Sequence, residues 1–586
     1  MRRFIVGLLA TIGFITILGI GGVLLLGSVM GGSRPAPSDR TVLKLDWRQL
    51  PGEDGGGGGT AFFGPRGASL AETVDALRRA AADKRVIGLV ATVSGGGPGF
   101  ASVQELREAI AFFRAAGKFA IIFSESFDTG AGGLRNWYLA TAFEQIWLQP
   151  SGDFGVVGIA TQVPFFKGGL DKLGVRFEGG RRLEFKSAPN TFLEPGFTTA
   201  HRENLQTLVD GLFGQMIEDV ARDRNLQSAE LRRLIDSAPL APPEALSAKL
   251  VDKLGYRDEV MAEIDRRAGR KDSLYEFRDY LEDSGVRARR GEAIAVVTID
   301  GAIVSSDEGG SPLTGGRLAV ADKLARAIDE AASEASIKAI VVRIDSPGGS
   351  YPASDTLRRA IERAKQKGKP VVVSFGDVAA SGGYFAALPA DVIVAQRGTI
   401  TGSIGVFGLK PVIGDLLDSL GVKVETLNAG ANAAMNTPTL GYTPQQQAAV
   451  DRQLDRIYAD FTRKVSDARR LDGTRLDAAA RGRVFTGVDA KAAGLVDELG
   501  GLTLAIAFAK AKAGIDAARD VHVRRFPAPK GRIEQLMELV SGQRAELAAR
   551  AELRRVTTEI SRRLGDLPLA WQAEAMRLPP LPPLWD

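Results

Sequence analysis

The chain has 586 residues, of which 45% are hydrophobic and 25% are charged, and its formal net charge is only +5. This length predicts several domains, the composition is that of a folded globular protein, and the small net charge argues against a nucleic-acid partner. The lack of cysteine excludes thiol nucleophiles and disulfides, and the two histidines, His201 and His522, match no metal-binding motif, so we expect neither a metal nor a cofactor.

An apolar run at residues 4–30 follows Arg2 and Arg3, and glycine, serine and threonine are its only other residues. A helix rises 1.5 Å per residue, so a helix over this run can cross a bilayer core of about 30 Å. A cleaved signal peptide is the alternative, but its apolar core usually has only roughly 7 to 15 residues. We therefore expect residues 1–34 to hold a cytoplasmic N-terminus and a retained transmembrane helix, which contacts the lipid bilayer through residues 4–30.

The charges before this run predict its orientation. Positive residues tend to stay in the cytoplasm, so Arg2 and Arg3 place the rest of the chain on the other side of the membrane. A domain without cysteine suits the oxidising bacterial periplasm. The expected location is the bacterial inner membrane, with a single pass and with the folded domains on the periplasmic side.

Beyond the apolar run, predicted strands alternate with predicted helices. In the first half, strands are expected at 41–47, 86–90 and 119–123, and helices at 69–84 and 103–116. In the second half, strands are expected at 293–299, 337–344 and 370–374, and helices at 318–332 and 354–367. This alternation is typical of an α/β fold with parallel sheets.

Short motifs also recur in the same order in the two halves. Gly-Lys at 117–118 recurs at 368–369, Leu-Gly-Val at 173–175 recurs at 420–422, and Leu-Val-Asp-Lys-Leu-Gly at 250–255 recurs as Leu-Val-Asp-Glu-Leu-Gly at 495–500. The offsets are 251, 247 and 245 residues, which indicates two tandem copies of one domain. We expect the copies at 35–256 and 291–513, joined by a charged linker at 257–290 and followed by a helical and proline-rich tail at 514–586.

Ser381 stands out because it follows a predicted strand and precedes Gly382 and a second glycine. At a strand-to-helix junction its hydroxyl would lie near unpaired N–H groups, which can stabilise an oxyanion. A glycine-serine turn that leads into a packed helix is the alternative for this segment taken alone.

Comparison of the two copies adds a candidate base. The position equivalent to Ser381 in the first copy is Leu134, whereas Lys186 of the first copy corresponds to Ala433 of the second. Each copy thus holds a residue that the other lacks. Because histidine is scarce, a lysine whose pKa is lowered by burial is the available base for a serine, although a surface lysine is the ordinary alternative.

A third element is the sequence Ser-Pro-Gly-Gly-Ser at 346–350, directly after a predicted buried strand. Its glycines can turn N–H groups toward a tetrahedral intermediate, as can the amide of Gly382. An isolated Pro-Gly-Gly marks only a turn, but here it precedes Ser381 on the next strand end of the same unit.

These motifs together resemble those of the signal peptide peptidase A family, also called protease IV, in its long tandem-domain form. The residues that carry the resemblance are Ser-Pro-Gly-Gly-Ser at 346–350, Ala-Ala-Ser-Gly-Gly-Tyr at 379–384, Thr-Gly-Ser-Ile-Gly at 401–405 and Lys-Ser-Ala at 186–188. The resemblance spans roughly residues 2–513 and implies a ClpP/crotonase-like fold in each half, with a Ser/Lys dyad assembled across the halves.

The same resemblance implies a role for each site residue. Ser381 would be the nucleophile and Lys186 the general base, Ser403 would orient the lysine, and Gly348 and Gly382 would donate to the oxyanion. The family forms a homotetramer and cuts signal peptides that remain in the membrane after their release. We therefore expect a membrane-anchored serine endopeptidase; a crotonase-like acyl-CoA enzyme and a non-catalytic membrane scaffold are the alternatives.

Overall fold

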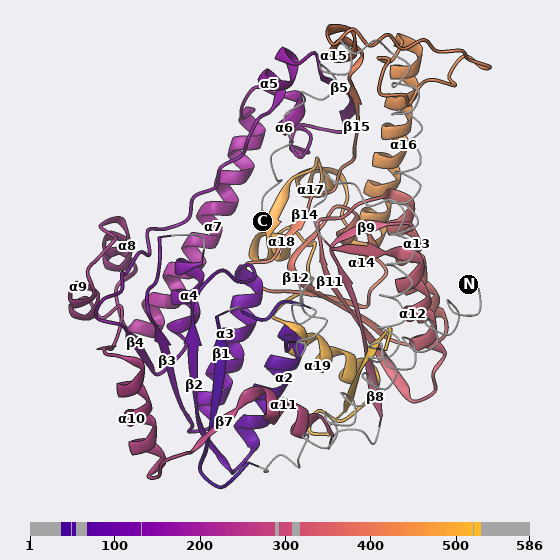
Figure 1. The fold of residues 1–586 in the computed structure, drawn as a ribbon. Coiled ribbons are helices and arrows are strands. Elements are labelled where there is room, and N and C mark those ends of the chain that lie inside the picture. Colours follow the sequence, from indigo (N-terminus) through magenta and orange to yellow (C-terminus); the bar gives the residue numbers. More distant parts are fainter. Residues whose placement is uncertain are drawn as a thin grey trace, which may run out of the picture. The chain divides into compact units, whose positions relative to one another are not determined.

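The computed structural model describes residues 37–48, 50–53, 67–129, 132–286, 292–306, 317–519 and 521–528. The described residues up to Phe526 belong to one compact unit (Figure 1). The expected transmembrane segment at 4–30 and most of the expected tail lie outside the described residues. Within the described ranges, every helix is too short or too polar to span a bilayer.

The first half of the chain builds a six-stranded sheet whose order is β6-β4-β3-β2-β1-β7, with parallel pairing throughout. The strands are β1 (Thr41–Trp47), β2 (Val86–Val93), β3 (Phe119–Ser124), β4 (Gln145–Leu148), β6 (Lys253–Leu254) and β7 (Leu274–Glu276). The central strands are runs of Val, Ile, Leu and Ala because a parallel sheet is covered on both faces.

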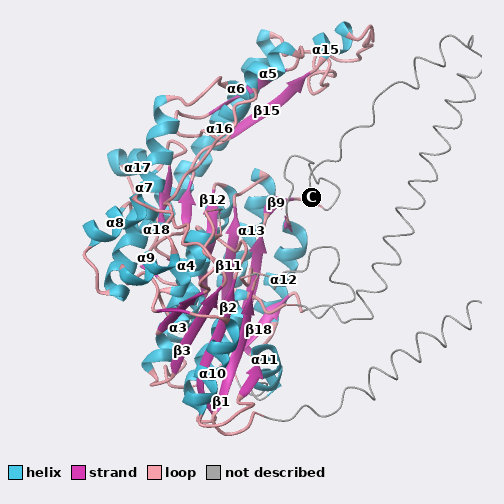
Figure 2. Cartoon of the chain, turned by 60° about the vertical axis from the view of Figure 1, so that its left-hand side comes forward, coloured by secondary structure: helices cyan, strands magenta, loops and turns pink. Residues whose placement is uncertain are grey.

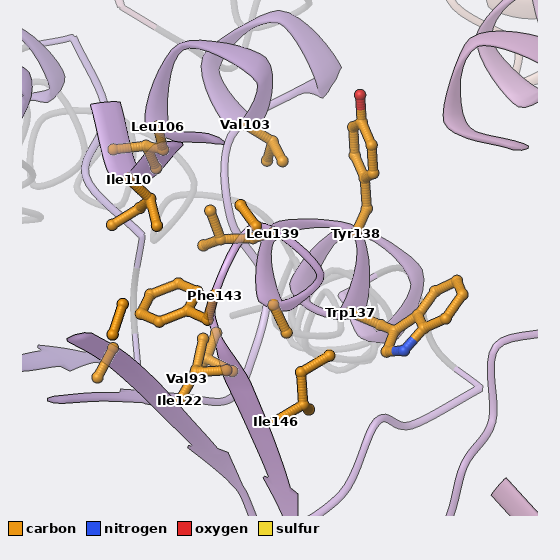
Figure 3. Close-up of a cluster of buried hydrophobic side chains, with 14 of the residues drawn as sticks. Val93, Val103, Leu106, Ile110, Ile122, Trp137, Tyr138, Leu139, Phe143 and Ile146 are labelled. Carbon is orange, nitrogen blue, oxygen red and sulfur yellow. The ribbon is translucent and has the colours of Figure 1, made fainter. Parts of the chain in front are cut away.

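Helices cover both faces of this sheet. On one face lie α2 (Leu70–Ala82), α3 (Phe100–Ala115) and α4 (Gly133–Ala140), and on the other lies α10 (Arg257–Ala268). Figure 3 shows the first of these layers, where Val103 and Leu106 of α3 and Leu139 of α4 lie above Ile122 and Ile146 of the strands. The opposite face is closed by apolar side chains of α10.

The second half repeats this arrangement. Its strands β8 (Ala293–Asp300), β11 (Ile337–Ser346), β12 (Val371–Ala380), β13 (Val392–Ala395), β17 (Glu498–Leu499) and β18 (His522–Phe526) pair in the order β17-β13-β12-β11-β8-β18. The covering helices are α12 (Ala321–Ser333), α13 (Tyr351–Gln366) and α14 (Gly382–Ala387) on one face and α19 (Leu502–Lys512) on the other. The order of strands and helices is the same as in the first half, as expected for tandem copies.

Equivalent hydrogen bonds support the offset found in the sequence. Trp137 Nε1 donates to the carbonyl of Leu250 at 2.9 Å in the first half. In the second half, Tyr384 OH donates to the carbonyl of Leu495 at 2.9 Å. Because Trp137 and Tyr384 are 247 residues apart, this alignment also sets Leu134 opposite Ser381.

The expected domain ends at 256 and 513 remain predictions, and two edge strands lie beyond them. Strand β7 pairs with β1 inside the expected linker, and β18 pairs with β8 past residue 513. The linker region also contains α10 and α11 (Phe277–Val286). These strands are short, which is why hydrophobic periodicity did not indicate them.

Two further strands extend the second sheet next to Ser381. Strand β14 (Ile400–Gly402) pairs in parallel with the last residues of β12, and β16 (Val484–Thr486) pairs with β14 in antiparallel orientation. Four short elements of the second half are β9 (Ala302–Val304), β10 (Leu318–Val320), α17 (Gly473–Ala479) and α18 (Gly487–Ala492). Strand β14 thus brings the Thr-Gly-Ser-Ile-Gly motif to the end of β12.

The two halves are also joined by a separate sheet of two strands, one from each half. Strand β5 (Arg176–Arg181) of the first half pairs antiparallel with β15 (Phe407–Val412) of the second half (Figures 1 and 2). Helices α5 (Lys167–Lys172), α6 (Asn190–Leu193) and α16 (Pro444–Arg469) contact this sheet. The other elements are α15 (Gly414–Ser419) and three helices that pack on the core of the first half, α7 (Thr199–Arg224), α8 (Ser228–Asp236) and α9 (Pro242–Ser247). The segment between β5 and α6 carries Lys186 toward the second half.

Candidate active site

Ser381 lies at a sharp turn between strand and helix. It follows the last residue of β12 and is the N-cap of α14, with φ at +53° and ψ at −116°. A positive φ is uncommon outside glycine, so neighbouring bonds must hold this conformation. Its N–H donates to the carbonyl of Gly402, and its carbonyl accepts from the N–H of Phe385, both at 2.9 Å. These bonds fix the backbone that presents the Ser381 hydroxyl.

Lys186 reaches this hydroxyl from the other half of the same chain. Its Nζ lies 3.0 Å from Ser381 Oγ, 3.0 Å from Ser403 Oγ and 2.9 Å from the Ser403 carbonyl oxygen. The lysine is only 3% exposed. The structure therefore brings together three residues that the sequence singled out separately.

Burial changes the acid-base character of Lys186. It lowers the pKa of the Lys186 ammonium from 10.5 to about 7, because removal from water disfavours the charged form. A neutral amine has two N–H donors and one lone pair. Two donations to Ser403 leave the lone pair free to accept the proton of Ser381.

Gly348 and Gly382 lie next to each other beside Ser381. A Cβ on Gly348, whose φ is +99°, would come within 2.6 Å of Gly382 N, and a Cβ on Gly382 would come within 2.3 Å of Ser354 Oγ. A side chain at Gly348 would therefore push its loop away from α14, and one at Gly382 would push α14 away from α13. The N–H of Gly348 donates to Ser346 Oγ at 3.1 Å. The two glycines are neighbours, and one of the two amides is held by a hydroxyl.

Two polar contacts, one buried and one partly buried, hold β11 and β12 against the first half. Arg343 of β11, which is 1% exposed, forms ion pairs with Glu53 and Glu105 at 2.6 Å each. Asp377 of β12 accepts from the N–H of Ser102 at 2.9 Å and from its hydroxyl at 2.8 Å, at the start of α3. Because β11 leads into the Gly348 loop and β12 ends at Ser381, these contacts fix both relative to the half that carries the lysine.

The sequence did not indicate that residues 482–484 contribute to the site. The Arg483 carbonyl accepts from the N–H of Ser403 at 2.7 Å, and the Gly482 N–H donates to the Ile404 carbonyl at 2.8 Å. A Cβ on Gly482 would come within 2.4 Å of Lys186 N, so this segment packs directly on the lysine backbone. No short motif marks these residues, because their role depends on contacts between distant parts of the chain.

A serine hydroxyl at a strand-to-helix turn, bonded to a buried amine that is partly neutral near pH 7, is an arrangement for nucleophilic catalysis. Fold and site together fit the class of serine hydrolases, with a lysine rather than a histidine hydrogen-bonded to the serine. The chain belongs to Peptidase family S49, whose profile matches residues 128–271 in the first copy and 363–516 in the second. It is a serine peptidase of the protease IV type.

Known relatives extend over most of the chain. Protease 4 of Salmonella typhi is 33% identical over 451 residues, which cover 75% of this chain and 71% of that protein. The chloroplastic serine protease SPPA of Arabidopsis thaliana is 29% identical over 484 residues, which cover 81% of this chain and 70% of that protein. A solved ClpP1 mutant from Listeria monocytogenes is 16% identical and covers 35% of this chain and 91% of its own, with a TM-score of 0.22, too low to support an argument.

Proposed function

We propose that this peptidase is a membrane-anchored endopeptidase that degrades cleaved signal peptides and other apolar peptides, with Ser381 as nucleophile and Lys186 as general base. The observation that supports the two roles is the 3.0 Å hydrogen bond between Lys186 Nζ and Ser381 Oγ, made by a lysine that is almost fully buried. Such a lysine can be neutral at the pH at which it must accept a proton.

In the proposed reaction, Ser381 Oγ attacks the scissile carbonyl carbon while its proton passes to the Lys186 amine. The developing oxyanion accepts hydrogen bonds from the amides of Gly382 and Gly348. To donate to it, the Gly348 N–H must give up its hydrogen bond to Ser346 Oγ. Lys186 then protonates the leaving amine, and an acyl-enzyme forms. Water attacks the ester with Lys186 again as base, and the proton returns to Ser381 as the acid product leaves.

Ser403 orients the lysine throughout this cycle. Its carbonyl and its hydroxyl both accept from Lys186 Nζ, so two of the positions around the nitrogen are taken. The remaining position faces Ser381 Oγ. This arrangement directs the lone pair of the neutral Lys186 amine toward Ser381 Oγ.

The proposal extends to fold and location. Each half is a ClpP/crotonase-like domain, and residues 4–30 anchor the chain in the bacterial inner membrane with both domains in the periplasm. The apolar run and its preceding arginines support the anchor, and the repeated parallel sheets support the domain class. An enzyme held at the membrane in this way meets signal peptides where they remain after cleavage.

The substrate class can be tested with matched peptides. We expect a detergent-solubilised signal peptide with a leucine-rich core to be hydrolysed with a kcat/KM at least about tenfold higher than a peptide of equal length whose core leucines are serine, since loss of several apolar contacts costs roughly 1 kcal/mol or more each. Mass spectrometry of the products gives rates and cleavage sites. Equal rates for the two peptides would contradict the proposed substrate class.

We also propose that the protein forms a homotetramer. The internal repeat suggests which segments pair between neighbouring chains. Strand β5 of the first copy pairs with β15 of the second copy within the chain. Shifted by 247 residues, their equivalents are 423–428 and 160–165, and neither segment belongs to a strand. Val424 and Leu427 are exposed in the first of these segments. We propose that 423–428 of one chain pairs with 160–165 of the next chain. This contact between chains would be equivalent to the pairing of β5 with β15 within one chain.

This interface makes a prediction about assembly. The double variant Val424→Asp, Leu427→Asp should dissociate the tetramer to monomers, because charges would enter a contact that is apolar in the proposed assembly. Light scattering after size-exclusion chromatography measures the mass. Leu246→Asp is the matched control, since Leu246 is an exposed leucine far from both segments in sequence. An unchanged mass of the double variant would refute the interface.

A further inference from the structure

Asn204 of α7 makes a contact that crosses from the first half to the second. Its side-chain Nδ2 donates to the Val484 carbonyl at 2.8 Å, and its Oδ1 accepts from the Val484 N–H at 2.9 Å. These two partners fix the orientation of the amide, since one side must donate and the other accept. Asn204 is only 2% exposed, and the two hydrogen bonds are partly buried. The amide thus occupies the place of a neighbouring strand along β16.

Strand β16 leads from this contact to the proposed catalytic pair. Val484 lies opposite Gly402 of β14, and the carbonyl of the preceding residue, Arg483, accepts from the N–H of Ser403 at 2.7 Å. The carbonyl and hydroxyl of Ser403 in turn accept from Lys186 Nζ. Asn204 is therefore linked to the lysine by hydrogen bonds through Val484, its chain neighbour Arg483, and Ser403.

The conformation of Ser403 needs such support. Its φ is +53°, a strained value for a residue other than glycine, and such residues keep their conformation only when their surroundings hold them. Strand β16 is short and has β14 as its strand partner on one side. On its other side the two backbone groups of Val484 are taken by Asn204, which replaces a strand there.

The repeat gives an independent indication. Helices α7 and α16 have the same length of 26 residues and are offset by 245, so the residue equivalent to Asn204 is Ala449. The copy that lacks the lysine therefore also lacks the amide. The charged and titratable neighbours of this region include the Glu184–Arg481, Arg481–Asp477 and Glu203–Arg483 ion pairs and His201 on α7.

We propose that Asn204 is a positioning residue for the catalytic pair: its amide holds β16 against β14 and thereby holds Ser403, and through it Lys186, in line with Ser381. This inference rests on the proposed roles of Ser381 and Lys186. Without the amide, β16 can move away from the Lys186 backbone, on which Gly482 packs. Water then reaches the amine, and the ammonium form is favoured.

The test compares Asn204→Ala and Asn204→Asp with Gln206→Ala, a variant of an exposed amide two residues along the same helix. Each full-length protein is assayed with a fluorogenic peptide over a range of pH, and active sites are counted with a serine-directed phosphonate. We expect both Asn204 variants to lower kcat per active site by about 10- to 100-fold, to change KM by less than about threefold, and to shift the acidic limb of the rate profile to higher pH. Gln206→Ala should match the wild type.

Asn204→Asp keeps the shape of the side chain and the bond from Val484 N–H, so it guards against a failure of the alanine variant to fold. An unchanged kcat per active site with an unchanged acidic limb in either folded variant would overturn the inference, because loss of stability alone lowers only the number of active sites. A separate experiment tests the proposed function itself. If the Ser381→Ala variant keeps the wild-type rate, the proposed function is wrong, whatever the Asn204 variants do.

Discussion

Replacement of Ser381 by alanine should lower kcat/KM for peptide hydrolysis by about 10⁴-fold or more, since the attacking oxygen is lost and only binding and oxyanion contacts remain. The fold should be unaffected, because the strained backbone of residue 381 is held by main-chain bonds to Gly402 and Phe385 that alanine retains. A fluorogenic peptide assay measures the rate, and circular dichroism during heating measures the midpoint of unfolding.

Ser419→Ala is the control for this experiment, because Ser419 is an exposed serine in α15 that bonds only within its own helix turn. It should keep wild-type activity. Retention of more than about a tenth of the activity by a folded Ser381→Ala protein would mean that another group attacks the peptide bond, since loss of the nucleophile costs far more than tenfold.

Replacement of Lys186 by methionine should lower kcat by about 10³-fold or more. Among the described residues, Lys186 is the one whose side chain hydrogen-bonds Ser381 Oγ and can accept its proton. Lys186→Arg should be as inactive, since a guanidinium stays protonated and cannot accept the proton. In the wild type, kcat/KM should fall below pH about 7, which is the pKa of the buried lysine. A steady-state rate profile measured from pH 5 to 9 checks both expectations; a flat acidic limb would argue against lysine as the base.

Stability gives a second measurement of the same group. The pKa of Lys186 is lower in the folded chain, about 7, than its ordinary value of 10.5, so between these pH values the unfolded chain binds more protons. Wild-type stability should therefore rise with pH across this window, through the contribution of this residue. Lys186→Met should be more stable than the wild type at pH 6, and the difference should shrink toward pH 10. An equal difference at both pH values would mean that the lysine is not desolvated.

Much of the site could be predicted because the two tandem copies in the chain can be compared with each other. The repeat aligned Ser381 with Leu134 and Lys186 with Ala433, and this complementary loss suggested that the two halves share one site. The structure bears out the proximity of the pair at 3.0 Å. The α/β class with parallel sheets also followed from the alternating strands and helices, since buried parallel strands give long apolar runs.

Other features could not be predicted because they depend on single contacts between distant segments. The amide of Asn204 meets the backbone of Val484 across the two halves, and backbone partners leave no pattern in the sequence. The same holds for Arg343, whose two carboxylate partners both come from the first half. The edge strand β18 has only five residues and alternates weakly, so its pairing with β8 was not expected.

The division of the site between two copies also determines when the enzyme can become active during synthesis. The proposed base is made first, and the proposed nucleophile follows 195 residues later. The edge strand β18 of the second sheet follows still later, at His522–Phe526. A partly synthesised chain therefore contains the lysine before its serine partner exists, and the proposed pair can form only after both copies have been made and have packed against each other.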